Sequence, residues 1–146
     1  MDDIALMKEA LAEARLAFDA GEIPVGAIVV KNGTIVGRGH NTREMDSDIS
    51  GHAEINALKE AGRNLGTWDL SECSIYVTLE PCPMCTGAIM QSRIRTIVYG
   101  EDDPQEGGLS KYRLLDYGNA NTLVSSGLLR EECRALLDSF FEKLRH

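Results

Sequence analysis

The sequence predicts an α/β protein, built as a three-layer α/β/α sandwich around a central mixed sheet of about five strands. The main observation is that short β-rich segments alternate with longer segments of helical periodicity. A second is that Ser74–Leu79 is apolar almost throughout, which is typical of a central strand covered on both faces. A third is the Asn32-Gly33 pair, a strong turn signal that predicts a hairpin.

The first part of the chain predicts a helix followed by that hairpin. Residues 2–20 carry apolar side chains at helical spacing, with an aspartate able to cap the start and a glycine able to end the helix. The spaced apolar residues are Ile4, Met7, Leu11, Ala14 and Phe18. Val25–Lys31 and Thr34–His40 then follow as the two strands joined by the Asn-Gly turn.

The rest of the chain alternates helices and strands. A helix is expected from His52 to about Ala61, where Gly62 would end it. The further predicted elements are the strand Ser74–Leu79, a helix over Pro83–Gln91, a strand over Arg95–Tyr99, a helix over Leu109–Leu115, a short strand around Thr122–Val124 and a final amphipathic helix over 129–144. The helices that begin near His52 and Pro83 are expected on the same face of the sheet.

Composition places the chain among ordinary globular proteins. The apolar fraction of 43% and the charged fraction of 26% suit one domain over residues 1–146 that is large enough to bury a core. No apolar run approaches the roughly 20 residues of a membrane span, and the N-terminus does not resemble a secretory signal. The four cysteines are too few and too unevenly spaced for a disulfide scaffold, so we expect a cytoplasmic protein.

Two short motifs, His52-Ala53-Glu54 and Cys82-Pro83-Met84-Cys85, carry the residues best suited to chemistry. Cysteines three apart lie on the same side of a helical turn, and a proline fits the first helical position. The partial positive charge at a helix N-terminus favours thiolates, which are the form that binds zinc. With a neutral His52 imidazole as third ligand, a tetrahedral zinc would keep one position open for water.

The cysteine pair has other interpretations when it is considered alone. A Cys-x-x-Cys motif also fits a redox pair or half of a structural zinc knuckle. A redox pair has no need of His-x-Glu, and the sequence offers no fourth ligand near Cys82 and Cys85 for a closed knuckle. The combined motifs therefore favour a catalytic zinc held by His52, Cys82 and Cys85.

Glu54 is expected to move protons rather than to bind the metal. It follows His52 by two residues, which on a helix turns its side chain by about 200°. Both side chains can then reach one water only from the first turn, beyond the end of the helix. Two thiolates reduce the acidity of the metal, so a proton acceptor is needed beside the water. The alternative is that Glu54 is a first-turn acid that merely complements the helix dipole.

These motifs resemble the cytidine deaminase-like superfamily, whose zinc enzymes carry H-x-E followed by P-C-x-x-C. Within it, the chain is most similar to bacterial tRNA adenosine deaminases and to free-base deaminases, namely fungal cytosine deaminase and bacterial guanine deaminase. The likeness runs from about Ile23 to Gly100. Besides the two motifs it includes Pro24-Val25-Gly26-Ala27, Gly37-Arg38-Gly39-His40-Asn41 and Ser92-Arg93-Ile94.

The resemblance implies hydrolytic deamination at an amino-substituted ring carbon of a nucleobase or nucleoside, with Zn²⁺ as cofactor and Glu54 as the catalytic residue. It also implies that the Asn41 side chain and the backbone of Ala27 and Glu80 contact the substrate. The alternative for Asn41 is a turn residue after a strand, and the substrate contact is favoured. Relatives of this type are usually homodimers, so a homodimer is implied as well.

The substrate is predicted from charge and from local resemblance. The net charge of −8 lacks the basic excess typical of proteins that bind a phosphate backbone, and Glu101, Asp102, Asp103 and Glu106 have no lysine or arginine between them. Where tRNA adenosine deaminases carry a lysine-bearing loop and an Asn-His-Arg stretch, this chain has an acidic segment and then Asn119-Ala120-Asn121. These departures argue against tRNA. Gly100-Glu101 and Lys111-Tyr112 resemble fungal cytosine deaminase instead, and this resemblance favours a free base of the cytosine kind.

Two alternatives stand beside that preference. One is a tRNA-specific adenosine deaminase that converts adenosine to inosine at the anticodon wobble position. The other, from a different class, is an inactive zinc-binding scaffold subunit, which the intact Glu54 argues against.

Three other side chains have weaker expectations. Cys73 and Cys133 are expected to pack in the core. Trp68 and the aromatic residues near the C-terminus could cover the substrate pocket or could equally serve in packing.

Overall fold

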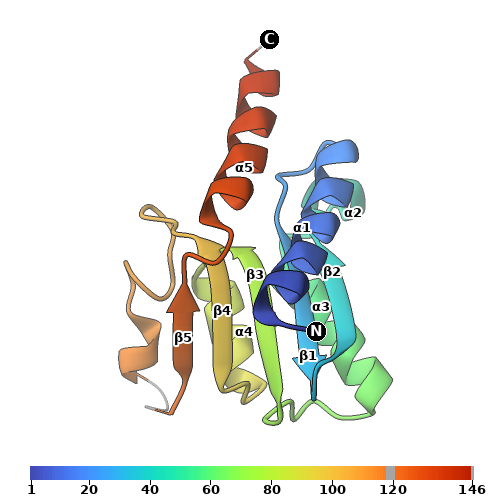
Figure 1. The fold of residues 1–146 in the computed structure, drawn as a ribbon, viewed down its shortest axis with the longest axis vertical. Coiled ribbons are helices and arrows are strands. Elements are labelled where there is room, and N and C mark those ends of the chain that lie inside the picture. Colours follow the sequence, from blue (N-terminus) through green and yellow to red (C-terminus); the bar gives the residue numbers. More distant parts are fainter. Residues whose placement is uncertain (118–120, 146) are drawn as a thin grey trace.

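The computed structural model describes residues 1–117 and 121–145 and forms a five-stranded sheet with helices on both faces (Figure 1). Asn119 and Ala120, which replace part of the Asn-His-Arg stretch, lie outside the described residues. The elements in chain order are α1 Asp3–Asp19, β1 Gly26–Lys31, β2 Thr34–His40, α2 Arg43–Asp46, α3 Ala53–Leu65, β3 Cys73–Leu79, α4 Pro83–Gln91, β4 Thr96–Glu101, the 3₁₀ helix η1 Leu114–Tyr117, β5 Leu123–Ser126 and α5 Arg130–Leu144.

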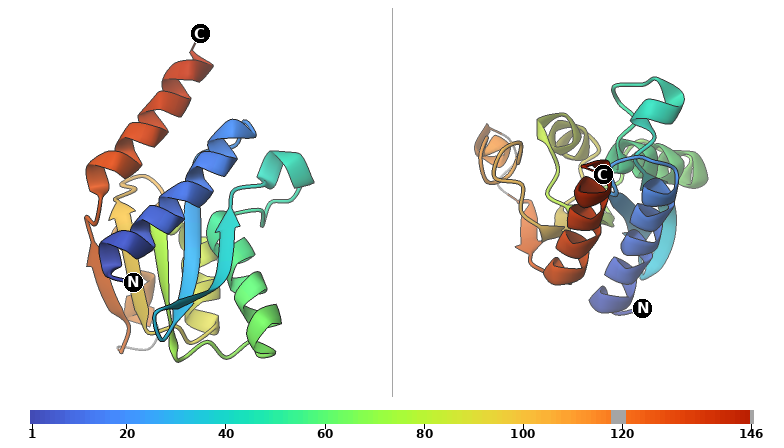
Figure 2. Two further views of the ribbon diagram at one scale, coloured as in Figure 1. Left: turned by 45° about the vertical axis from the view of Figure 1, so that its right-hand side comes forward. Right: turned by 90° about the horizontal axis from the view of Figure 1, so that it is seen from above.

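The sheet is mixed, as the sequence predicts. Its strand order is β2-β1-β3-β4-β5. β1 runs antiparallel to β2 and β3, whereas β4 runs parallel to both β3 and β5. Seen from above, α1 and α5 cover one face and α3 and α4 cover the other, which gives the three predicted layers (Figure 2).

Two clusters of buried side chains join these layers. One lies between the sheet and the α3/α4 layer and includes Ala57, Val77, Ile89 and Ile97, all fully buried. The other packs Met7 and its neighbours on α1 against the opposite face of the sheet. Because β3 is covered by both layers, its near-continuous apolar sequence is explained by burial on both faces.

The backbone of helix α3 packs unusually close to strand β2. A Cβ atom added at Gly39 would lie 2.3 Å from the backbone oxygen of Ala53 and 2.5 Å from the backbone nitrogen of Ala57. Only glycine leaves room for a helix backbone at that distance. The first turn of α3, where the candidate site begins, is therefore fixed directly on the sheet.

Two sequence predictions about helices were wrong. The helix expected to end at Gly62 continues to Leu65, and Gly66 ends it in the left-handed conformation with φ of 69°. Gly62 keeps helical geometry because a glycine inside a helix weakens it without breaking it. The helix expected over Leu109–Leu115 is instead a series of turns followed by η1.

A helix that crosses a membrane needs about 20 mostly apolar residues, and the longest of the described helices, α1, has 17 residues. None of them is both long enough and apolar enough to cross a bilayer.

Candidate active site

The site forms where the first turns of α3 and α4 come together. His52 is the residue that precedes α3 and Cys82 is the residue that precedes α4. Both have extended backbone angles, and neither side chain caps its own helix. Pro83 occupies the first position of α4, where its missing N–H costs no helical hydrogen bond. The imidazole and the thiol are therefore free to point off the helix ends toward each other.

The spacing of His52, Cys82 and Cys85 matches three ligands of one metal ion. The Nδ1 atom of His52 lies 3.7 Å from Cys82 Sγ and 3.5 Å from Cys85 Sγ. Tetrahedral zinc with bonds of usual length separates a nitrogen and a sulfur ligand by about 3.6 Å. One imidazole and two thiols are a donor set that zinc favours, and all three ligand atoms lie within 4.8 Å of one another. The geometry and the donor chemistry thus both fit zinc.

Charge on the thiols is set by their mutual contacts. A hydrogen bond from Cys85 lowers the pKa of the Cys82 thiol to about 4, and its contact with His52 acts in the same direction. The contact with Cys82 in turn raises the pKa of His52. Cys82 is therefore disposed to be a thiolate at neutral pH, the form a metal ligand requires.

Glu54 lies beside these ligands in a dry environment. Its side chain is only 4% exposed, and this burial raises the pKa of its carboxyl to about 7. A carboxyl with such a pKa can both accept and donate a proton near neutral pH. The geometry therefore allows Glu54 to act as a proton carrier.

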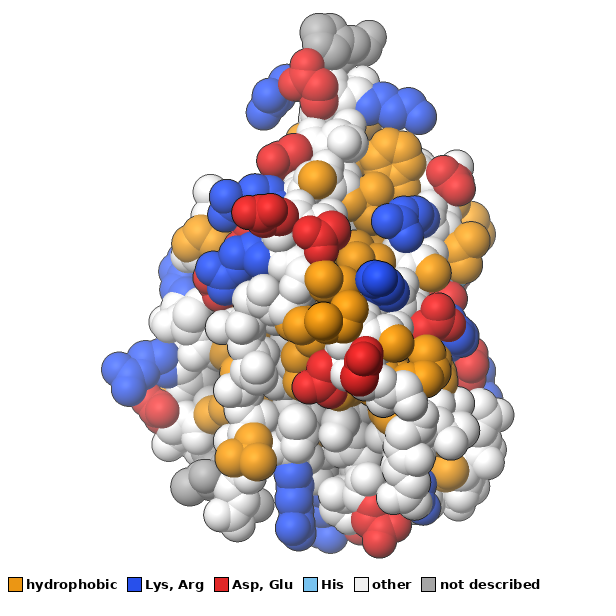
Figure 3. All heavy atoms as spheres, viewed as in Figure 1, with side chains coloured by type: hydrophobic (Ala, Val, Ile, Leu, Met, Phe, Trp, Pro, Cys, Tyr) orange, Lys and Arg blue, Asp and Glu red, His pale blue; other side chains and the backbone are white. Residues whose placement is uncertain are grey.

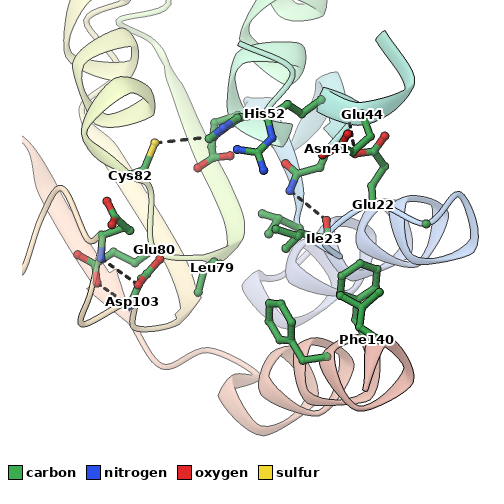
Figure 4. Close-up of a pocket in the computed structure, with 17 residues that line it drawn as sticks. Glu22, Ile23, Asn41, Glu44, His52, Leu79, Glu80, Cys82, Asp103 and Phe140 are labelled. Atoms are coloured by element: carbon green, nitrogen blue, oxygen red, sulfur yellow. Dashed lines mark hydrogen bonds between the residues drawn. The ribbon is translucent and has the colours of Figure 1, made fainter. Parts of the chain in front are cut away.

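His52, Cys82 and Glu54 face a cavity of about 560 Å³ whose walls come from distant parts of the chain, while Cys85 is fully buried behind them (Figure 4). The lining residues are Gly21, Glu22, Ile23, Val25, Asn41, Arg43, Glu44, His52, Glu54, Leu79, Glu80, Cys82, Asp103, Glu106, Phe140, Phe141 and Leu144. The last three come from α5, which extends past the ends of the strands (Figure 1). On the face drawn in Figure 3, hydrophobic side chains gather between α5 and α1. The cavity therefore combines a polar floor with an apolar wall.

Asn41 lines the cavity and also fixes its shape. Its Nδ2 donates to the backbone oxygen of Ile23 at 3.0 Å, and its Oδ1 accepts from the N–H of Ala53 at 2.9 Å. Asn41 thus ties the segment before β1 to the first residue of α3, next to His52. Each of its polar groups has further bonding capacity, so a substrate contact stays a prediction.

Glu80 and Ala27 are placed differently from each other. The Glu80 carboxylate is 2% exposed and accepts hydrogen bonds from the N–H groups of Asp103, Leu109 and Ser110 and from the Ser110 hydroxyl. It therefore holds the segment 103–110 in place. Ala27 is fully buried in β1 and does not line the cavity, so its expected backbone contact remains a prediction.

Sequence reasoning missed Arg43 and Glu22. Arg43 begins the short helix α2, which the sequence did not predict. The Glu22 carboxylate accepts hydrogen bonds from the N–H groups of Glu44 and Met45, which holds α2 at the edge of the cavity. Neither residue belongs to a motif. The only signal was their closeness in sequence to Ile23 and Asn41.

Only the aromatic residues near the C-terminus cover the pocket, and Trp68 neither covers it nor packs in the core. Trp68 is 63% exposed, does not line the cavity and lies under the guanidinium of Arg93, 5.0 Å from the ring centre. Phe140 and Phe141 do line the cavity and form an edge-to-face pair. Cys73 and Cys133 are buried, as expected for core residues.

A protein-family model matches this chain along nearly its whole length. The model of the MafB19-like deaminases matches residues 1–145. The chain belongs to this deaminase family. It is therefore a hydrolytic deaminase of the zinc type with the cytidine deaminase-like fold, as its motifs predicted.

Individual proteins similar to this chain include both tRNA deaminases and a guanine deaminase. The chain is 44% identical to a tRNA-specific adenosine deaminase of Bacillus subtilis, and the match covers 98% of this chain and 91% of that protein. Among solved structures, one from a study of A-to-I editing by tRNA deaminases at the wobble position has a TM-score of 0.86 and 36% identity, over 91% of this chain and 99% of that one. A guanine deaminase from Nitrosomonas europaea has a TM-score of 0.84 and 28% identity, over 95% and 84% of the two chains.

These similarities bear on the substrate expected from the sequence. They do not support the preference for a free base of the cytosine kind. They favour the alternative of a tRNA-specific adenosine deaminase. The idea of an inactive scaffold subunit is set aside, because the family is one of enzymes.

Proposed function

We propose that this enzyme deaminates adenosine to inosine at the anticodon wobble position of tRNA. The observation that carries the proposal is the 44% identity, along almost the full length of both chains, to a tRNA-specific adenosine deaminase. Support also comes from the 36% identity to a solved tRNA deaminase at the wobble position. The 44% identity exceeds that to two guanine deaminases of known structure, which is 28% in one case and 36%, over 70% of this chain, in the other.

Part of the negative charge that argued against tRNA is paired with arginines within the protein. Glu101 is 6% exposed and is paired with Arg130 and Arg134, and Asp102 pairs with Arg130 at 3.1 Å. Charges paired in this way add little to the field that an approaching polyanion meets. Of the four acids in the segment 101–106, Glu101 and Asp102 are thus compensated by arginines, and Asp103 and Glu106 are the two that line the cavity.

We assign the zinc ligands to His52, Cys82 and Cys85 and the proton transfers to Glu54. A zinc ion held there would lower the pKa of a water molecule and stabilise negative charge on its oxygen. The Glu54 carboxylate accepts the proton of the attacking water and delivers protons to the ring nitrogen and to the departing amine. Adenosine and water are thereby converted to inosine and ammonia.

We assign substrate contacts to the Asn41 side chain and to the backbone of Ala27 and Glu80. Asn41 is held from two sides, so its remaining donor and acceptor are oriented in advance. Phe140 and Phe141 give the cavity an aromatic wall on which an unpaired base can stack. A base extruded from a single-stranded loop fits such a cavity better than a base inside a duplex.

The proposal extends to the architecture. We propose that residues 1–146 act as one deaminase domain, because a single sheet carries all described elements and the family match covers residues 1–145. A homodimer is proposed on the resemblance to dimeric relatives.

A second candidate substrate is free guanine. It is favoured by the TM-score of 0.84 to the guanine deaminase and by the acidic side chains of Asp103 and Glu106 in the cavity lining. A carboxylate can accept hydrogen bonds from the N–H groups of a purine base.

The deciding experiment compares inosine formation in a tRNA anticodon stem-loop with ammonia release from guanine, adenine, cytosine and their nucleosides. The stem-loop carries adenosine at the wobble position, and a matched stem-loop carries it one position away. We expect inosine only in the first, and none of it with the Glu54→Ala variant. Turnover of guanine by the zinc-loaded protein, with the stem-loop unchanged, would replace the proposal by its second candidate.

A further inference from the structure

The cavity lining has an uneven distribution of charge. Its acidic members are Glu22, Glu44, Glu54, Glu80, Asp103 and Glu106. Among the described residues that line it, Arg43 is the only lysine or arginine. A nucleotide in a polynucleotide brings a phosphate on each side of its ribose, so a phosphodiester near this cavity has one cationic side chain available to it.

The acidic side chains do not neutralise Arg43. The ion pairs found within residues 1–117 and 121–145 join other arginines, such as Arg38 and Arg130, to carboxylates, and none of them involves Arg43. Glu22 and Glu80 are nearly fully buried and accept hydrogen bonds from backbone N–H groups instead. The guanidinium of Arg43 therefore keeps its donors for a ligand.

The backbone of Arg43 is held although its side chain is exposed. Its carbonyl accepts a hydrogen bond from the N–H of Asp48 at 3.1 Å, and the N–H of the preceding Thr42 donates to Gly51 at 2.9 Å. Gly51 packs so closely that a Cβ atom there would lie 2.8 Å from the Arg43 nitrogen. Glu22 fixes the next two residues of α2. A side chain that starts from a fixed point loses less entropy when it binds.

We propose that Arg43 binds a phosphate of the substrate backbone beside the target nucleoside. This inference rests on the proposed function. A base directed at Glu54 and His52 leaves its ribose and phosphates toward the opening, and Arg43 is exposed there on the same wall. The planar guanidinium can donate two parallel hydrogen bonds to phosphate oxygens. Arg43 then acts as a substrate-positioning residue that favours a nucleotide in a strand over a free base.

The test compares Arg43→Gln with Arg43→Lys and with a control, Arg95→Gln. Arg95 is exposed at the start of β4, at the opposite end of the sheet from the cavity, so its loss changes the net charge equally. For the stem-loop we expect KM to rise about tenfold in Arg43→Gln, as for the loss of one charge-assisted hydrogen bond, with kcat within about twofold. The slope of log KM against log salt concentration should fall by about 1, which is the change expected when one phosphate contact is lost. Arg43→Lys should retain part of the affinity and most of the salt slope.

A second measurement locates the phosphate. Stem-loops are made with a single uncharged methylphosphonate on the 5′ or the 3′ side of the target adenosine. One of them should weaken the wild type about as much as Arg43→Gln does and should not weaken Arg43→Gln further. Adenosine and adenosine 5′-monophosphate distinguish a backbone phosphate from a terminal one. If the monophosphate alone reproduces the dependence on Arg43, the phosphodiester assignment is overturned.

The outcomes separate this inference from the proposed function. If the stem-loop is a good substrate but Arg43→Gln behaves like Arg95→Gln, the role of Arg43 is wrong and the proposed function stands. Additive losses in the methylphosphonate pairs would also overturn the role of Arg43. If wild-type protein leaves the stem-loop unchanged while it deaminates guanine, the proposed function itself fails. Zinc content and thermal unfolding of each variant show whether the site has stayed folded.

Discussion

At the scale of single residues, the buried carboxyl of Glu54 gives the sharpest prediction. Glu54→Ala should keep zinc, because the three candidate ligands are untouched, and should lower kcat by at least about 10²–10⁴-fold, the usual contribution of a general acid–base. The measurement is inosine formation at saturating substrate, together with zinc per chain by mass spectrometry. A zinc-replete variant with normal kcat would remove Glu54 from the mechanism.

The metal assignment is tested on the cysteines. Cys82→Ser or Cys85→Ser should lose most of the zinc at neutral pH, because a serine hydroxyl stays protonated where a thiolate ligand is needed. Cys73→Ser is the matched control, since Cys73 is also a buried free thiol but lies at the start of β3. It should keep its zinc. Full zinc occupancy in both site variants would contradict the assignment.

Sequence reasoning found the residues whose chemistry is tied to a motif. His52, Cys82 and Cys85 come together because each sits at or beside a helix start, and that arrangement can be read from local spacing. Arg43 could not be found in this way. It reaches the cavity because Glu22 binds the backbone of α2, a contact between segments with no shared pattern.

At the scale of elements, Glu80 links β3 to the segment 103–110. Glu80→Gln replaces one acceptor oxygen by an NH₂ group that faces backbone donors. We expect a loss of about 1–3 kcal/mol in the free energy of unfolding, the cost of an unsatisfied buried donor. KM should also rise, because Asp103 and Glu106 of this segment line the cavity.

Urea unfolding and steady-state kinetics measure these two effects. Ser110→Ala is a graded control, since it removes the hydroxyl contact and leaves the N–H contacts. It should cost less than Glu80→Gln. Equal stability of Glu80→Gln and wild type would show that the segment is held by other contacts.

The helix α5 is joined to β4 by Glu101. Glu101→Gln removes the charge that Arg130 and Arg134 share, and because both arginines are partly exposed the cost should be only about 1 kcal/mol. The larger effect should be local, with faster amide hydrogen exchange in α5. Glu131→Gln, in the first turn of α5 and exposed, is the control. Unchanged exchange in Glu101→Gln would show that apolar packing alone holds the helix.

Elements were predicted where the local pattern and the tertiary packing agree. The Asn32-Gly33 turn, with positive φ at both residues, closes β1 and β2 as expected. The helix expected over Leu109–Leu115 does not form, because contacts with other parts of the chain hold this segment in turns. A Cβ at Gly108 would lie 2.3 Å from the Thr86 hydroxyl, and Glu80 takes up the N–H groups of Leu109 and Ser110. Neither contact is visible in a local sequence window.

At the scale of the whole molecule, net charge and the similar proteins point to different substrates: the charge favours a free base, and the similar proteins favour tRNA. The value of −8 counts every carboxylate equally. In the folded chain Glu101 and Asp102 are paired with arginines, whereas Arg43 lines the cavity without an ion pair among the described residues. Binding depends on the local field, which the fold sets and the composition does not.

The last prediction concerns assembly. An open groove between α3 and α4 has an apolar lining that includes Leu58, Leu70 and Trp68, the last being 63% exposed. Exposed apolar surface of this kind is typical of interfaces, and the dimeric relatives suggest a second copy as its partner. Light scattering at micromolar concentration should give twice the chain mass of 16.0 kDa. Trp68→Glu should shift the protein toward the monomer, because a dimer would bury an unpaired charge. Tyr117→Glu, at an aromatic residue that is 85% exposed and does not line the groove, should leave the mass unchanged, and a wild-type monomer would rule out the dimer.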